Sequence, residues 1–247
     1  FDANYTNGGL PNLTLIRFMH DHTGSFGTAI DKVNTPERDV ADNDYAVGLV
    51  VQKIANNPLY KNNTLIFVVE DDAQDGGDHM DSHRTTAYVA GAYVRNATVS
   101  TAYTTLNFMR TMEEVLGLPP MNLNDALAAP MSDIFNTSPT PWTFSATPAA
   151  ILYCTQLPLP ASNTPCNDPT PNAAYWARVT RGMDFTDADL VDGQTFNRVL
   201  WKGMMGHKPY PSKPSGKDLR QNREELLAHY RRSVRTIGLP ISRPAGE

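Results

Sequence analysis

The 247-residue chain fits one large domain or two small ones, and its 40% hydrophobic content is enough for an apolar core. With 26 acidic and 21 basic side chains it has a net charge of -5, which gives no broad attraction for nucleic acid or anionic lipid. The longest apolar runs, such as LIFVV, are far shorter than the roughly 20 residues that cross a bilayer. We therefore expect neither a nucleic-acid partner nor a membrane span.

Strand-like and helix-like segments alternate over the first 135 residues, which is typical of an α/β fold. The run TLIFVVE at 64–70 is continuously apolar, as in a strand buried on both faces of a parallel sheet. Asp39 or Asp42 is the expected N-cap of the first helix. The expected elements are strands at 13–18, 64–70 and 85–93 and helices at 41–56 and 104–116.

The domain organisation follows from composition. Three strands are few for a sheet of this kind, which usually has about five or six, so we expect 1–137 to be the C-terminal part of a larger α/β domain. Residues 138–182 are rich in Pro, Thr and Ser and predict an irregular excursion. Residues 183–247 predict a helical C-terminal segment that packs on the domain, with helices at 187–204 and 218–237.

Two features indicate an oxidising compartment. Cys154 and Cys166 have no metal-ligand pattern around them and predict a local disulfide, with a pair of free thiols as the alternative. Five N-x-S/T triplets are candidate glycosylation sites, although an Asn- and Thr-rich chain also produces such triplets by chance. The triplets begin at Asn4, Asn12, Asn62, Asn96 and Asn136. Together these features favour a secreted, extracellular or periplasmic protein.

The densest chemical feature is EDDAQDGGDHMDSH at 70–83, directly after the second expected strand. It holds six carboxylates and two imidazoles, whose like charges repel unless a cation neutralises them. A divalent metal ion (Zn, Mn, Fe or Ca) explains this crowding, and a solvated acidic turn is the alternative. The candidate ligands are Asp71, Asp72, His79 and His83, with Asp78 and Glu70 as secondary candidates.

A second cluster, His20-Asp21-His22, follows the first expected strand. In a parallel sheet the carboxyl ends of the strands share one edge, so this cluster and the acidic segment would meet in one crevice. A polar loop with no function is the alternative for these three residues. Asp42 and Asp44 open the next helix, where capping explains at least one of them without a ligand role.

With these residues in place, the chain resembles the bacterial phosphoesterase family of phospholipase C-like and acid phosphatase-like proteins, within the alkaline phosphatase superfamily. The resemblance covers nearly all of residues 10–210 and is closest to the extracellular branch of the family. The stretches that carry it are LPNLTLIRFMHDHTGS, VADNDYAVGLVVQKIANNPLYKNNTLIFVVEDDAQDGGDHMDSHRTTAYVAGAYV, TMEEVLGLPPMNLNDALAAPMSDIF and MDFTDADLVDGQTFNRVLWKGMMG.

The resemblance implies an alkaline-phosphatase-like sheet flanked by helices and a metal pocket built from three elements. These correspond to Asp71-Asp72, Asp78-His79 and Asp21-His22, with His83 as a further histidine. It implies metal ligation by Asp21, Asp71, Asp72, His79 and His83, and catalytic roles for His22, His79 and His83. His20 departs from the family pattern, which has Asn there.

A larger departure is that the family's E-N-R-[ST]-[FY]-D block, which supplies the hydroxyl nucleophile, does not occur in these residues. Thr23, Ser25 and Ser82 lie near the candidate ligands, but none is in a nucleophile elbow. The expected function is metal-dependent hydrolysis of phosphate esters, completed by an upstream segment. The alternatives are a non-catalytic extracellular subunit that self-assembles and a metal- or phosphate-binding module without turnover.

Overall fold

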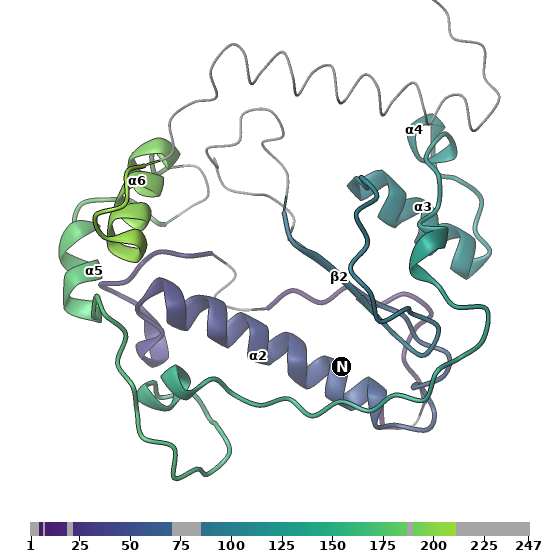
Figure 1. The fold of residues 1–247 in the computed structure, drawn as a ribbon, viewed down its shortest axis with the longest axis horizontal. Helices are drawn as coiled ribbons and strands as arrows, with labels where there is room; N and C mark the ends of the chain where they lie inside the picture. The colour runs from purple at the N-terminus through teal and green to yellow at the C-terminus, as the bar shows by residue number, and fades with distance from the viewer. Residues whose placement is uncertain (1–4, 7, 19–21, 71–84, 187–189, 211–247) are drawn as a thin grey trace, which may run out of the picture. The chain divides into compact units, whose positions relative to one another are not determined.

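The first long element in the chain is α2 (Pro36–Ala55), which follows the short 3-10 helix η1 (Ile30–Lys32). In this computed structural model the structure describes residues 5–6, 8–18, 22–70, 85–186 and 190–210. The described residues contain five α-helices and one two-stranded sheet (Figure 1). They divide into two compact units, one from the described parts of 1–72 and 85–191 and one from 192–210.

Helix α2 begins earlier than its hydrophobic pattern indicates. Thr35 is the N-cap, and its side-chain oxygen accepts a hydrogen bond from the Arg38 amide at 3.3 Å. Pro36 then occupies the first helical position, where its fixed φ suits the helix and its missing N–H costs nothing. The prediction that Asp39 or Asp42 caps this helix is therefore wrong, because both residues lie inside it.

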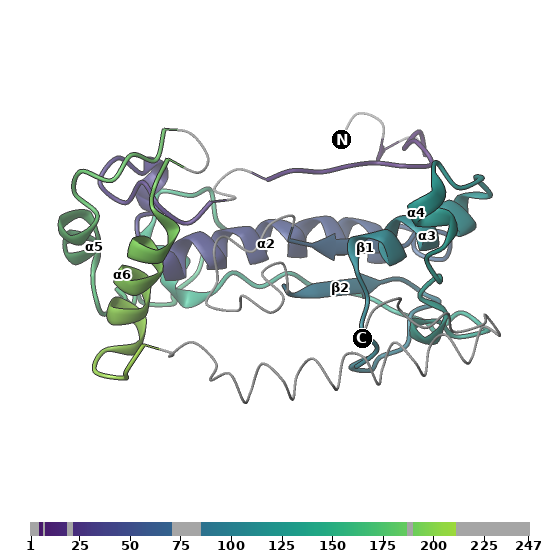
Figure 2. The ribbon, with the colours of Figure 1, turned by 90° about the horizontal axis from the view of Figure 1, so that it is seen from above.

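The sheet consists of β1 (Ile66–Val69) and β2 (Ala87–Ala90), which lie side by side in Figure 2. The strands are antiparallel, with Ile66 opposite Ala90 and Val69 opposite Ala87. The predicted parallel arrangement is wrong for this pair, because β1 pairs with the next strand along the chain. Burial on both faces is also wrong, since β1 is only half-buried and Val69 is exposed.

Residues 13–18 form no strand, contrary to the prediction. The segment has a strand-like composition, yet it belongs to no sheet among the described residues, and the side chain of Leu15 is 97% exposed. Composition alone is insufficient for a strand, which also needs a neighbour for its backbone hydrogen bonds. Over the described residues the fold is mixed but mostly helical, with no extended α/β sheet.

Helix α3 (Thr105–Leu116) agrees with the prediction at both ends. Its first turn is closed by the Thr104 amide, which donates to Asn107 Oδ1 at 2.7 Å. Gly117 ends the helix at φ 68°, the left-handed conformation that glycine adopts without a Cβ penalty. The predicted helix stop is therefore confirmed.

Helix α3 supplies the centre of an apolar cluster in the first unit. Buried Phe108 packs with Met131 and Ile134, and the ring of Phe67 on β1 meets the Phe108 ring edge-on at 5.8 Å between centroids. The short α4 (Leu123–Ala126) and η2 (Ser132–Ile134) bring the chain back onto this cluster. The cluster thereby fixes the small sheet against α3.

The Pro-rich segment is mostly irregular, as predicted, and it lies along α2 (Figure 1). A side chain of α2 and its C-cap residue hold it there: the Ala146 amide donates to Gln52 Oε1 at 2.8 Å, and Asn56 Nδ2 donates to the Phe144 carbonyl at 2.7 Å. Within it, η3 (Ala150–Cys154) and α5 (Ala173–Val179) are regular elements that composition did not predict. The predicted Cys154–Cys166 disulfide is present.

The second unit contains α6 (Gly193–Met205), which overlaps the predicted helix at 187–204. Asp192 is its N-cap and accepts from the Thr195 amide at 2.8 Å. Arg198 lies over the ring of Tyr210, 4.6 Å from its centroid. The predicted helix at 218–237 lies outside the described residues. None of the described helices is long and apolar enough to cross a membrane.

Replacing Phe108 with Ala tests the cluster beneath α3. The change removes a ring that is 7% exposed and leaves a cavity, so we expect the free energy of unfolding to fall by about 3–5 kcal/mol. Urea titration of both proteins measures this difference. Val115→Ala on the same helix is the control, because Val115 is 55% exposed and its loss is expected to cost far less. Equal losses in the two variants would contradict this core.

Candidate functional site

The turn that contains His22 is the best-defined part of the predicted site. His22 itself is exposed, and the chain then enters buried Gly24 at φ 157° and Ser25 at φ 52°. The turn closes where the Thr28 amide donates to the Ser25 carbonyl at 2.9 Å. The Gly24 amide donates a hydrogen bond to the carboxyl group of Asp39 in the first turns of α2. The turn is thus fixed to α2 two residues after His22.

Phe185 holds the same turn from another side. A Cβ built on Gly24 would lie 2.5 Å from Cδ1 of Phe185, which is closer than any real side chain tolerates. The close approach and the positive φ both require glycine at this position. Gly24 is therefore clamped between the carboxyl group of Asp39 and the ring of Phe185.

Asp39 is an unusual carboxyl group because its side chain lies in the protein interior. The residue is 5% exposed, and its Oδ2 atom has no hydrogen-bond partner within the described part of the chain. The pKa of Asp39 is raised to about 8, mainly by burial and to a smaller extent by the charges of Asp42 and Glu37, while the hydrogen bond from Gly24 lowers it. At neutral pH Asp39 is therefore mainly protonated and uncharged.

Arg38, next to Asp39, links the site to the disulfide loop. The residue is 3% exposed and forms an ion pair with Asp168, which follows Cys166 by two positions. Its guanidinium also donates to Asn34 Oδ1 at 2.6 Å. Because a buried guanidinium without partners is costly, the segment just after the disulfide supplies a counter-ion that the start of α2 needs.

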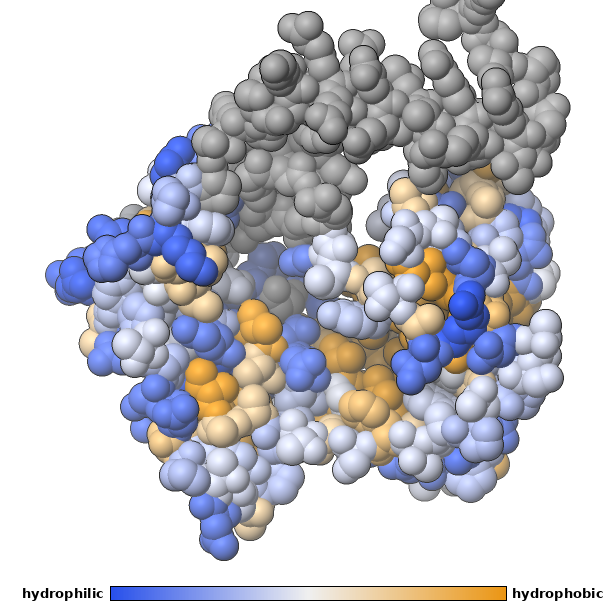
Figure 3. Space-filling model, in the orientation of Figure 1, coloured by the Kyte–Doolittle hydropathy of each residue, from blue (hydrophilic) through white to orange (hydrophobic). Residues whose placement is uncertain are grey.

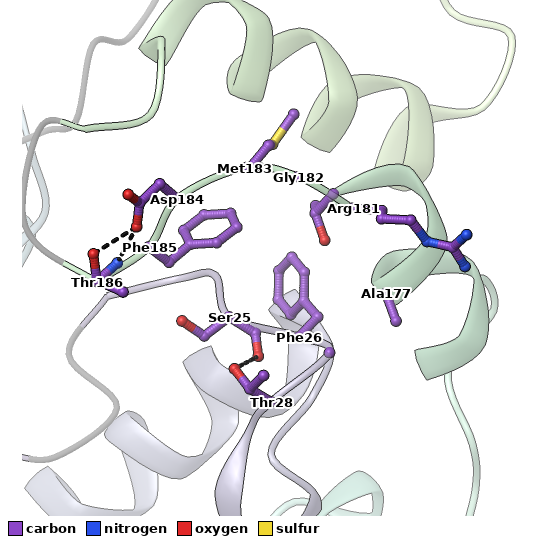
Figure 4. A pocket seen from close by; sticks show the side chains of 12 residues that line it. Ser25, Phe26, Thr28, Ala177, Arg181, Gly182, Met183, Asp184, Phe185 and Thr186 are labelled. Atoms are coloured by element: carbon purple, nitrogen blue, oxygen red, sulfur yellow. Dashed lines mark hydrogen bonds between the residues drawn. The ribbon is translucent and has the colours of Figure 1, made fainter.

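A cavity of about 370 Å³ opens beside the turn. One wall is the turn at 25–28, and the other is Ala177 of α5 with the segment 180–186 that follows α5 (Figure 4). The rings of Phe26 and Phe185 both point into the space between these walls (Figure 4). The space is largely open to solvent.

The structure places one described member of each predicted cluster. His22 lies in the turn before α2, and Glu70 lies at the end of β1, where its carboxylate accepts a hydrogen bond from the hydroxyl of Thr85. Because β1 and β2 are antiparallel, Glu70 and Thr85, the residues on either side of 71–84, lie next to each other. The other predicted site residues lie outside the described residues: His20, Asp21, Asp71, Asp72, Asp78, His79 and His83.

Among the described residues, one group of potential metal ligands lies close together. It comprises Cys154, Cys166 and Asp168, whose ligand atoms are within 4.8 Å of one another. Both sulfurs are joined in the disulfide and Asp168 pairs with Arg38, so this group is no metal site in the oxidised protein.

The candidate glycosylation sites differ in their exposure. Asn12, Asn62 and Asn96 are exposed, and Asn4 lies outside the described residues. Asn136 is half-buried, and its Nδ2 atom donates to the Val94 carbonyl at 3.4 Å. The three exposed triplets are therefore more open to modification than Asn136.

Sequence reasoning missed two residues that shape the site, Asp39 and Phe185. A local signal existed for Asp39, because Thr35-Pro36 is a typical N-cap and first-position pair that places Asp39 in the first turns of α2. No local signal could have predicted that Phe185 packs on Gly24, since the two lie far apart in the chain.

No protein-family model, no curated protein and no solved structure matches this chain. The family resemblance of the motifs is therefore a prediction that the comparisons do not test.

The buried carboxyl group of Asp39 predicts a pH-dependent stability. Its pKa is about 8 in the folded chain and about 4 in the unfolded chain, so the folded state binds an extra proton between these values. The stabilisation of the folded state by the protonated Asp39 is complete below pH 4 and is lost as the pH rises through 8. We expect the free energy of unfolding to fall over this range, and Asp39→Asn to flatten this fall and to be more stable than the natural protein at pH 9.

Urea titrations at a series of pH values between 4 and 9 measure this dependence. Asp44→Asn is the matched control, because Asp44 lies exposed on the same helix. If Asp39→Asn kept the pH dependence of the natural protein, the buried protonated carboxyl group would be refuted.

Proposed function

We propose that the chain is part of a metal-dependent phosphoesterase that hydrolyses phosphate esters. The observation that carries the proposal is the position of the segment EDDAQDGGDHMDSH, which begins at the carboxyl end of β1 with Glu70. This segment, which connects the two antiparallel strands, combines carboxylates with imidazoles, the side chains that bind divalent metal ions in proteins. The motif resemblance to alkaline-phosphatase-like phosphoesterases supports the same function.

The chemistry of the donor set fits a divalent metal ion. Asp21, Asp71, Asp72, His79 and His83 are the residues that would hold it, and carboxylate oxygens with imidazole nitrogens suit zinc, manganese or iron. Lewis-acid polarisation of the phosphoryl oxygens is the chemistry that such a site supplies when it is occupied.

His22 would act as a proton donor to the leaving alkoxide. Its exposed position leaves it accessible to a substrate, and the clamp on Gly24 restricts the turn that carries it. In this proposal the nucleophilic hydroxyl comes from an upstream segment of the kind found in the family that the motifs resemble. The disulfide and the exposed N-x-S/T triplets support an extracellular or periplasmic site of action.

A second candidate function is that of an extracellular assembly subunit without catalysis. Apolar side chains are exposed along α2 and around the sheet (Figure 3), and Val40 and Tyr88 are each 65% exposed. Contact with another copy of the chain would cover these side chains. Self-association therefore competes with phosphoester hydrolysis as the role of this chain.

Metal analysis of the purified protein tests the leading proposal. We expect bound metal in the natural protein and its loss in Asp71→Asn and in His79→Ala, because each change removes a candidate ligand. Plasma mass spectrometry measures the metal, and hydrolysis of 4-nitrophenyl phosphate in the presence of the upstream segment measures the activity.

Asp187→Asn is the control, because Asp187 is an acidic residue outside both candidate clusters. Equal metal content in all three variants would refute the assignment of the site. A metal-free, inactive protein that forms defined oligomers in light scattering would favour the assembly subunit.

A further inference from the structure

The loop closed by the disulfide begins at an end that other contacts hold in place. Leu152 of η3 is completely buried, and the Thr155 hydroxyl donates to the Leu152 carbonyl at 2.6 Å. The Gln156 amide then donates at 2.7 Å to the carbonyl of Asp31 in η1, just before α2. None of these contacts involves a sulfur atom, so we expect the Cys154 end of the loop to keep its place beside η1 in the reduced chain.

The other end of the loop depends on the disulfide. Residues 160–170 form no helix or strand, and the side chain of Asp168 is 69% exposed. In the described part of the chain, these residues are joined to the rest by two links besides packing, the disulfide at Cys166 and the ion pair of Asp168. A carboxylate oxygen of Asp168 lies within 4.8 Å of both sulfur atoms. The disulfide therefore sets the position from which Asp168 reaches α2.

The partner of Asp168 is the buried guanidinium of Arg38. Arg38 is 3% exposed, and its Nε atom has no hydrogen-bond partner among the described residues. Besides Asp168, its guanidinium contacts Asn34 Oδ1 at 2.6 Å and the Lys32 carbonyl at 3.5 Å, and both of these groups are neutral. Without Asp168, Arg38 would be a buried cation without a counter-ion in the described part of the chain, which favours its movement toward water.

The position of Arg38 affects the His22 turn because Arg38 and Asp39 are consecutive residues at the start of α2. The Arg38 amide donates to the N-cap Thr35, and the carboxyl group of Asp39 accepts the Gly24 amide. A movement of Arg38 toward water shifts the part of the helix that carries Asp39. The hydrogen bond that holds Gly24 then weakens.

We propose that closure of the Cys154–Cys166 disulfide orders the His22 turn, which makes the site sensitive to the oxidation state of the cysteine pair. In this step two thiols lose two protons and two electrons and form the S–S bond, while a disulfide oxidant is reduced to two thiols. The reduced chain has a loose turn, and arrival in an oxidising compartment orders it. The inference goes beyond the proposed function, since it uses none of the candidate metal ligands.

Hydrogen exchange of the Gly24 amide, measured by nuclear magnetic resonance, tests the proposal on the oxidised chain and on the chain reduced with dithiothreitol. We expect reduction to lower the protection of Gly24 at least about tenfold, which corresponds to about 1.4 kcal/mol. The amides of α3 are the internal control and are expected to change by less than about twofold. A Cys154→Ser/Cys166→Ser variant is expected to match the reduced chain.

Asp168→Asn separates the ion pair from the disulfide. In the oxidised chain we expect this change to lower the protection of Gly24 about three- to tenfold, because Arg38 loses its counter-ion. In the reduced chain it is expected to change the protection by less than about twofold, since Asp168 is no longer held beside Arg38. Asp31→Asn is the matched control, because Asp31 is an exposed carboxylate just before α2 and forms no ion pair among the described residues.

Equal protection of Gly24 in the oxidised and reduced chains would overturn the proposal. An unchanged Gly24 amide in oxidised Asp168→Asn, or the same effect of this change in both oxidation states, would also overturn it. Loss of protection throughout α3 on reduction would show general unfolding in place of selective control of the turn. A metal-free protein that keeps the coupling would refute the phosphoesterase and leave this inference intact.

Discussion

The start of α2 buries polar side chains, and two of them, Arg38 and Asp39, have partners in distant parts of the chain. Thr35, Arg38 and Asp39 are 0%, 3% and 5% exposed. Because a buried polar group without a hydrogen bond costs free energy, each of them requires a fixed neighbour. The carboxyl group of Asp39 accepts a hydrogen bond from the Gly24 amide, and the guanidinium of Arg38 forms an ion pair with the carboxylate of Asp168.

This requirement ties three regions of the first unit to one helix end. The His22 turn is held at Gly24, the segment that follows the Cys154–Cys166 disulfide is held at Asp168, and Phe185 covers Gly24 from the segment after α5. The cavity is the space that remains between the turn and that segment. Site geometry in this chain therefore depends on helix packing and buried polar contacts, and less on the small sheet.

The elements that sequence predicted well are those whose signals are local. Helix α3 carries a clear apolar face and ends at Gly117, and both signals lie within a few residues of the helix. The predicted strand at 13–18 was wrong because a strand also depends on a partner elsewhere in the chain. The direction of β1 relative to β2 also depends on residues outside β1. The apolar run at 64–70 therefore predicted a strand but could not predict that its neighbour is antiparallel.

The same distinction applies to the site. The carboxylates and imidazoles are visible as a cluster in the sequence, while the buried state of Asp39 and the contact of Phe185 with Gly24 follow from tertiary packing alone. α5 was missed because a Pro- and Thr-rich surrounding composition hides a short helix, although Asn172 caps it and accepts from the Tyr175 amide at 3.1 Å. Its residue Trp176 is completely buried, which is why this helix is fixed.

The hydrogen bond from Gly24 to Asp39 orders the His22 turn. Hydrogen exchange of the Gly24 amide, followed by nuclear magnetic resonance in the natural protein and in Asp39→Leu, tests it most directly. We expect a protected amide in the natural protein and fast exchange in the variant, with the amides of α3 equally protected in both. A Gly24 amide that exchanges rapidly in the natural protein, or stays protected in Asp39→Leu, would contradict the account.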